Sequence, residues 1–256
     1  MYLRAAHAET SLPALRDLAL RHPLGVLTTA IPHPTHPLIQ ASHIPFVLDP
    51  SPSPDRPDIL RGHLARANPQ SKTFIHHLLS RAEAGHSAEH LEAEVLVLFT
   101  SPVQHYVTPK FYMATKPETG KVVPTWNYAA VQAYGRARIY HDAKSPVTQK
   151  FLATQIDDLS KYAEEEIMGF DGKDGNKGAW NVKDAPDKFI ELLSKAIVGI
   201  EIEVDRLEGK WKMSQELGEG DREGTVKGFE ELGTEEGRRM AETVRVKGEE
   251  KAAAKA

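Results

Sequence analysis

The 256-residue sequence contains no cysteine, which excludes disulfide bonds and any zinc or iron–sulfur site with cysteine ligands. It has no apolar run near the roughly 20 residues that a membrane helix needs. The first eleven residues lack the apolar core of a secretory signal, and no Asn-x-Ser/Thr sequon is present. We therefore expect no membrane association and a cytoplasmic location, with the nucleus as a further compartment.

Several functional motifs are absent as well. The sequence has no Gly-x-Gly-x-x-Gly dinucleotide fingerprint, no phosphate-binding Walker loop and no Gly-x-Ser-x-Gly nucleophile elbow. A net charge of -4 gives no overall attraction to nucleic acid, and no helix-turn-helix pattern is recognisable. Direct DNA binding is therefore doubtful, because it would need a local basic patch.

The most informative stretch that is present runs from 122 to 138, VVPTWNYAAVQAYGRAR. Pro124, Asn127 and Gly135 interrupt this apolar run, and its β-branched and aromatic residues predict one or two central strands. Asn127 is the exception in this stretch, because an amide between two large aromatic residues needs partners for its donor and its acceptor. Either the backbone or a ligand must supply them.

The remaining strands and helices come in clusters. Strands are expected at 26–30, 38–48, 59–67, 94–100 and 197–214, the last as two strands hinged near 208–209. Helices are expected after Ser11, Ser71 and Ser145 and over 187–196. Because the helices lie between clusters of strands, the pattern predicts a mainly β fold with peripheral helices (α+β), an antiparallel or mixed barrel.

This pattern also suggests where the domain ends. We expect residues 1–215 to form the barrel with its peripheral helices. Residues 216–256 are rich in charge, Gly and Ala, and they predict a helical C-terminal extension whose last twenty residues fray or are disordered.

Ten of the twelve histidines fall before residue 91, which raises the question of a metal site. The pairs His33/His36 and His86/His90 come without the Glu of a zincin motif or a third ligand. The loop at 169–178 lacks the oxygen ligands of an EF-hand. Scattered surface histidines are the favoured interpretation, and no metal is predicted.

His43 and His63 differ from the others, because each lies in an apolar strand beside a small residue, Ser42 or Gly62. A buried imidazole must be hydrogen-bonded, and a small neighbour leaves room for a flat ligand. A structural role and a role at a site both remain open.

Arg66, Lys210 and Lys212 are the candidates for binding an anion. The two lysines share a strand face by their i, i+2 spacing, while Trp211 between them is expected to point into the core. Two cations on one face suit a phosphate, and Ser214 adds a hydroxyl donor. Solvated lysines on an edge strand, which discourage aggregation, are the alternative.

Five motifs together resemble the PaiB family: SHIPF at 42–46, GHLARANPQ at 62–70, VPTWNYAAVQAYG at 123–135, IVGIEI at 197–202 and GKWKMSQ at 209–215. Members of that family are described as FMN-binding split-barrel proteins and labelled negative transcriptional regulators. The resemblance extends from residue 1 to about residue 233, and its five separated motifs make it specific.

The resemblance implies a split β-barrel homodimer that holds flavin in a groove at the subunit interface. Related flavoproteins bind the FMN phosphate with Arg, Lys and Ser/Thr side chains, a chemistry that Arg66, Lys210, Lys212 and Ser214 match here. The side chains that become candidates to line the isoalloxazine ring are those of Trp126, Asn127, Tyr128 and Gln215.

Three functions are compatible with this resemblance. The first is an FMN-binding protein with a regulatory role, direct or indirect. The second is a flavin-dependent oxidoreductase in which His43 or His63 donates a proton near the flavin. The third is a haem-binding or haem-handling protein on the same barrel, with an exposed histidine as axial ligand.

Overall fold

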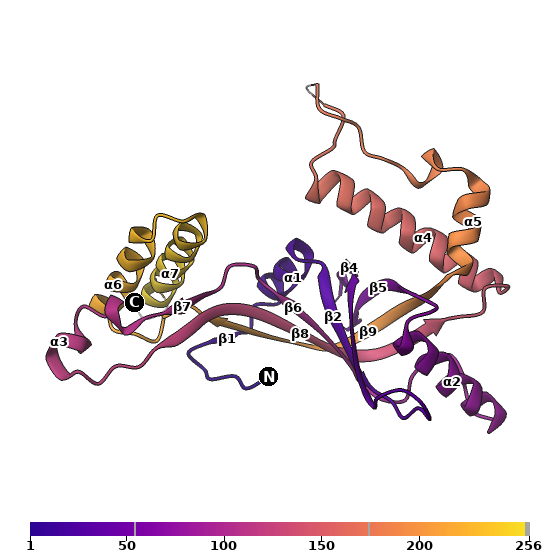
Figure 1. Cartoon of the computed structure of the whole chain (residues 1–256), viewed down its shortest axis with the longest axis horizontal. Helices are drawn as coiled ribbons and strands as arrows, with labels where there is room; N and C mark the ends of the chain where they lie inside the picture. The colour runs from indigo at the N-terminus through magenta and orange to yellow at the C-terminus, as the bar shows by residue number, and fades with distance from the viewer. Residues whose placement is uncertain (54, 174, 254–256) are drawn as a thin grey trace. The chain divides into compact units, whose positions relative to one another are not determined.

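The computed structural model describes residues 1–53, 55–173 and 175–253 (Figure 1). The chain packs into two compact units, residues 19–99 with 132–207 and residues 1–18 with 100–131 and 208–256. We call the first the barrel unit and the second the terminal unit, and the long strands β8 and β9 have a part in each. The strands are β1 (Ala8–Glu9), β2 (Leu24–Ala30), β3 (Ile39–Pro45), β4 (Val47–Asp49), β5 (Asp58–Ala65), β6 (Val95–Thr100), β7 (His105–Val107), β8 (Thr125–Tyr140) and β9 (Ile197–Lys212). The helices are α1 (Leu12–Arg21), α2 (Pro69–Glu83), α3 (Thr115–Thr119), α4 (Pro146–Tyr162), α5 (Asp187–Lys195), α6 (Glu219–Glu231) and α7 (Glu235–Ala253).

The strands of the barrel unit close on themselves through one bent stretch of chain. β3 pairs antiparallel with β2, with Ile44 opposite Gly25. The chain then breaks at Phe46, beyond Pro45, which has no N–H to continue the ladder. Past the break, β4 pairs with β5, with Val47 opposite Arg61. Since the sheet order is β3-β2-β6-β8-β9-β5-β4, residues 39–49 join its two ends, and the predicted α+β split barrel is confirmed.

The interior of the barrel follows from alternation along its strands. In β9, Val198, Ile200 and Ile202 are fully buried, while Glu201 and Glu203 on the other face are half-exposed.

Small residues let the wall of the barrel close tightly. A Cβ added at Gly62 would lie 2.8 Å from Cγ2 of Ile44 and 3.2 Å from the Phe46 ring. The close approach expected at Gly62 is therefore filled by the chain's own side chains.

Two local predictions need correction, whereas β8 is a single strand of 16 residues, within the prediction of one or two. β9 is also one strand of 16 residues, so there is no hinge at 208–209. Helix α2 is capped by Asn68, whose Oδ1 accepts a hydrogen bond from the N–H of Gln70 at 2.8 Å, and not by Ser71. Asn68-Pro69 provides both a capping side chain and a proline in the first turn, which explains the earlier start.

The terminal unit contains a helical hairpin made by α6 and α7, which lie side by side in Figure 1. Met240 and Val244 of α7 are fully buried, and so is Phe229 of α6. The C-terminal extension is helical over 219–231 and 235–253, and its frayed end stays a prediction. Residues 254–256 lie outside the described part. Charged residues dominate the composition of α7, but Gly237, Met240, Ala241, Val244 and Gly248 are buried together on one face.

Two further findings concern the expected absences. In the described ranges, no helix has both the length and the apolar character needed to cross a bilayer. Within the same ranges, no three His, Asp or Glu side chains are arranged to hold a metal ion. Residue 174 of the loop that was compared with an EF-hand lies outside those ranges.

Candidate functional site

The terminal unit brings the two candidate lysines together with aromatic residues at the end of β9. β9 is continuous through Lys212, so the side chains of Lys210 and Lys212 leave the same strand face, as their spacing predicts. Nζ of Lys210 lies 5.5 Å from the centre of the Tyr128 ring and donates to the carbonyl oxygen of Tyr2 at 3.2 Å. This end of β9 thus presents a cation against an aromatic face.

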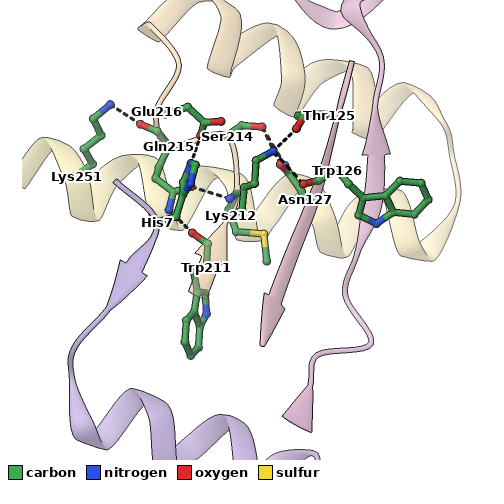
Figure 2. Close-up of polar contacts among 11 residues, drawn as sticks. His7, Thr125, Trp126, Asn127, Trp211, Lys212, Ser214, Gln215, Glu216 and Lys251 are labelled. Carbon is green, nitrogen blue, oxygen red and sulfur yellow. Dashed lines mark hydrogen bonds and ion pairs between the residues drawn. The ribbon is translucent and has the colours of Figure 1, made fainter. Parts of the chain in front are cut away.

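Lys212 is half-buried and is held from β8. Its Nζ donates to Oγ1 of Thr125 and to the carbonyl oxygen of Trp126, the latter at 3.1 Å (Figure 2). Burial lowers the pKa of Lys212, and the nearby positive charges of Lys210 and Arg4 lower it further, against the opposing effect of Glu216. A bound anion would relieve this repulsion.

Behind the lysines lies a buried polar pair, Asn127 and Ser214, both fully inaccessible to solvent. Nδ2 of Asn127 donates to Oγ of Ser214 at 3.0 Å, and that hydroxyl lies 3.2 Å from Oδ1 of Asn127, to which it donates in turn. Ser214 has φ 60°, a left-handed conformation that costs a residue other than glycine about 1–3 kcal/mol. The partner of Asn127 is thus the side chain of Ser214, and not the backbone or a ligand, the two sources expected from the sequence.

Gln215 braces the same turn from inside. Its Oε1 accepts from the N–H of Met213 at 2.6 Å, and its Nε2 donates to the carbonyl oxygen of Trp211. Trp211 is half-exposed, and Nζ of Lys247 lies 5.6 Å from its ring centre, so the prediction that it points into the core is wrong. α7 covers Trp211 with a charged side chain, and sequence alternation alone does not reveal that.

A second polar group joins the N-terminal segment to this turn. His7 is buried, and its Nε2 lies 3.1 Å from Oε2 of Glu216, close enough for an ion pair although the contact lacks the direction of a hydrogen bond. Nζ of Lys251 donates to the carbonyl oxygen of Gln215 (Figure 2). Beside these residues is a pocket of about 340 Å³, lined in part by His7, Trp211 and Lys251.

The predicted ring-lining residues divide into two groups. Trp126 is 49% exposed, and its Nε1 donates to Oε1 of Gln104 at 3.2 Å, while its ring meets Tyr106 edge to face. Tyr128 is half-exposed. Asn127 and Gln215 are buried and engaged within the chain, so only the two aromatic residues offer free surface to a ligand.

The other three candidates lie in the barrel unit. Arg66 donates from Nε to the carbonyl oxygen of Lys195 at 3.2 Å, and from Nη2 to those of His141 and Ile197 at 2.6 and 3.3 Å. These bonds tie β5 to the ends of β8 and β9.

The two candidate histidines of that unit differ from each other. Nδ1 of His63 lies 2.7 Å from Oε1 of Gln155, a fully buried residue of α4. His43 is exposed, so the expectation of a buried imidazole does not hold there.

Two residues that contribute to the site were missed. Arg4 lies near enough to lower the pKa of Lys212, and Thr125 accepts a hydrogen bond from its ammonium. Thr125 could have been predicted from the sequence, because it lies two residues before Asn127 and so on the same face of β8. Nothing in the local sequence connects Arg4 with a strand two hundred residues away.

The curled antiparallel sheet of the barrel unit defines a split-barrel protein, and the end of β9 carries two lysines beside aromatic rings. The chain belongs to the family described as "Putative FMN-binding domain", which it matches over residues 1–206. The resemblance to flavin-binding split barrels is thereby confirmed. The match ends four residues before Lys210, so the role of that strand end rests on its geometry.

The chain is similar to several known proteins. An uncharacterized protein of Emericella nidulans is 54% identical over 257 residues, which cover 98% of this chain and 99% of that protein. Protease synthase and sporulation protein PAI 2 of Bacillus subtilis is 27% identical over 202 residues, 79% of this chain and 78% of its own. A FAD and haem binding protein from Mycobacterium smegmatis aligns structurally with a TM-score of 0.44 and 13% identity, covering 80% of this chain and 73% of its own.

Proposed function

We propose that the chain binds FMN at the end of β9, with Lys210, Lys212 and Arg4 taking the phosphate and Tyr128 and Trp126 contacting the ring system. The observation that carries this proposal is that Lys210 and Lys212 leave one face of β9, with Nζ of Lys210 5.5 Å from the Tyr128 ring and Nζ of Lys212 3.1 Å from the carbonyl oxygen of Trp126. The positive charges of Lys210 and Arg4 lie near enough to lower the pKa of Lys212, against the opposing effect of Glu216. Glu216 already offsets repulsion among these cations, and a bound phosphate would add to that effect.

The residues present fit the group. A phosphate monoester carries close to two negative charges and accepts several charge-assisted hydrogen bonds, which ammonium and guanidinium groups donate. The exposed face of Trp126 and the half-exposed ring of Tyr128 suit a flat aromatic system. When bound, FMN supplies redox chemistry that amino-acid side chains lack. Arg66 is not part of this site, because it lies in the barrel unit and its Nε and Nη2 donate to backbone carbonyl oxygens.

The test compares FMN with riboflavin, which carries the same ring without the phosphate. Both are titrated into the full chain and followed by flavin fluorescence, and the ratio of the two dissociation constants isolates the phosphate. The variant is Lys210→Ala/Lys212→Ala. Its matched control is Lys121→Ala/Lys227→Ala, which removes two exposed lysines of the same unit and changes the net charge equally.

We expect the double variant to weaken FMN by about 30-fold or more and to leave riboflavin within about twofold, since each charge-assisted hydrogen bond contributes about 1.5–3 kcal/mol in favourable geometry. The control should leave both affinities unchanged. Equal binding of FMN and riboflavin by the wild-type chain, or an unchanged ratio in the double variant, would show that the phosphate does not bind there.

We also propose that two copies pair, so that flavin lies at a subunit interface. Trp126, Tyr106 and Val123 are 49%, 44% and 72% exposed in the terminal unit, an apolar surface that a second copy or a flavin ring would cover. Light scattering on the purified chain tests the pairing, and a mass of a single 28.4 kDa chain at micromolar concentration would contradict it.

A regulatory role is the further part of the proposal, and we place it downstream of flavin binding rather than on DNA. A net charge of -4 disfavours direct contact with DNA phosphates. Salt-sensitive retention of duplex DNA by the purified chain would overturn that placement. The alternatives have their own signatures: a Soret band for haem, and steady oxidation of a nicotinamide cofactor with added FMN for an oxidoreductase.

A further inference from the structure

We infer that Asn127 and Ser214 are positioning residues that set the cationic end of β9 for a phosphate, rather than groups that touch the flavin. This inference rests on the proposed FMN site and deepens it. Both side chains are fully buried, and each is engaged by the other. A residue without accessible surface acts on a ligand through its neighbours.

The backbone at Ser214 shows what has to be held. Of the described residues other than glycine, Ser214 is the one with a positive φ. Strain of this kind persists only where surrounding contacts over-determine the conformation. Here the hydroxyl of Ser214 is fixed by the amide of Asn127, which approaches it with both its nitrogen and its oxygen.

The hydrogen-bonded pair of Asn127 and Ser214 acts close to Lys212, because Ser214 follows that lysine by two residues. Three consecutive residues of β8 receive the end of β9: Thr125 and the carbonyl of Trp126 hold the Lys212 ammonium, and Asn127 holds Ser214 (Figure 2). Met213 between them is buried. Loss of the hydrogen bonds between Asn127 and Ser214 would let the turn after Lys212 change conformation. The Lys212 ammonium would then no longer be held in a fixed position.

The test uses Ser214→Ala, Ser214→Gly and Asn127→Ala in the full chain, with the FMN-to-riboflavin affinity ratio as readout. Glycine adopts positive φ without strain, so Ser214→Gly removes the hydrogen bonds to Asn127 and also relieves the strained backbone. Thr225→Ala is the control, because it deletes another fully buried hydroxyl of the same unit, one that donates to the carbonyl of Asp221.

We expect each of the three variants to lower the preference for FMN by about fivefold or more, with riboflavin affinity within twofold of wild type. Combining Ser214→Gly with Lys212→Ala should lower the preference for FMN little more than Lys212→Ala alone. Both changes remove the same interaction, that of Lys212 with the phosphate. Thr225→Ala should reduce thermal stability and leave the ratio unchanged. A structural effect alone would instead weaken both flavins together.

An unchanged ratio in Ser214→Gly, or full additivity with Lys212→Ala, would overturn the positioning role while the FMN site itself stands. If wild type shows no preference for FMN, the proposed function fails instead. Should Asn127→Ala not fold, Ser214→Gly decides the question alone, since it introduces no strain at this turn.

Discussion

Gly135 in β8 gives a direct test of how β8 and β9 meet in the wall of the barrel. A Cβ at this position would lie 2.0 Å from the carbonyl oxygen of Glu203 and 2.9 Å from its carbonyl carbon. Real Cβ contacts stay beyond 3.0 Å, so Gly135→Ala requires the two backbones to separate by at least about 1 Å. Backbone atoms cannot rotate away as a side-chain tip can.

We expect Gly135→Ala to lower the free energy of unfolding by about 3 kcal/mol, the upper end of overpacking costs, because a shift of that size disturbs the ladder on both sides. In a chain of this length that corresponds to a fall in Tm of roughly 6–12 °C. Thermal and urea unfolding followed by circular dichroism measure both quantities.

Gly178→Ala is the matched control for this substitution. No atom lies within 4 Å of a Cβ at Gly178, whose φ is not in the left-handed region, so we expect a change within about 0.5 kcal/mol. If Gly135→Ala is as stable as this control, then the close approach of Gly135 to the backbone of Glu203 is wrong.

Two further predictions follow, one for the terminal unit and one for the barrel unit. In the terminal unit, burial alone would raise the pKa of Asp221, but hydrogen bonds from Thr115 and the backbone N–H of Ala114 outweigh this and lower it. The stability that Asp221 contributes is therefore fully present above the ordinary pKa near 4 and is lost as pH falls through the lowered value. Asp221→Ala should cost about 1–2 kcal/mol at pH 7, with a difference from wild type that shrinks below pH 4, and a pH-independent difference would contradict this. In the barrel unit, Arg66→Ala removes the donors to three carbonyl groups and should cost about 1–3 kcal/mol of unfolding free energy, whereas an unchanged urea midpoint would show that these bonds do not hold β5.

The candidate site shows where sequence reasoning succeeds and where it stops. The spacing of Lys210 and Lys212 placed both on one strand face, because side-chain direction in a strand depends only on parity. The partner of Asn127 was beyond reach, since Ser214 lies 87 residues away and meets it only through the pairing of β8 with β9. Only the long-range contacts of the folded chain decide which residue is the partner of a buried polar side chain.

The C-terminal segment shows the same limit for a whole element. Its charge and glycine content are typical of a loosely held tail, yet α7 packs as a helix through Ala253. The decisive feature is the close approach of α6, where a Cβ at Gly248 would lie 2.5 Å from Nε of Arg222. Composition averages over both faces of a helix, whereas packing depends on one.

By itself the sequence determined where most of the strands lie, the clustered order that makes a barrel, and the two lysines that share a face. These properties are local, since they follow from the period of the backbone and from the chemistry of neighbouring residues. Tertiary structure alone decided that residues 39–49 close the barrel, that Arg4 joins the lysines, and that Asn127 holds Ser214 in a left-handed turn. Each of these is a contact between residues far apart in the chain, whose energy exists only once the fold has brought them together.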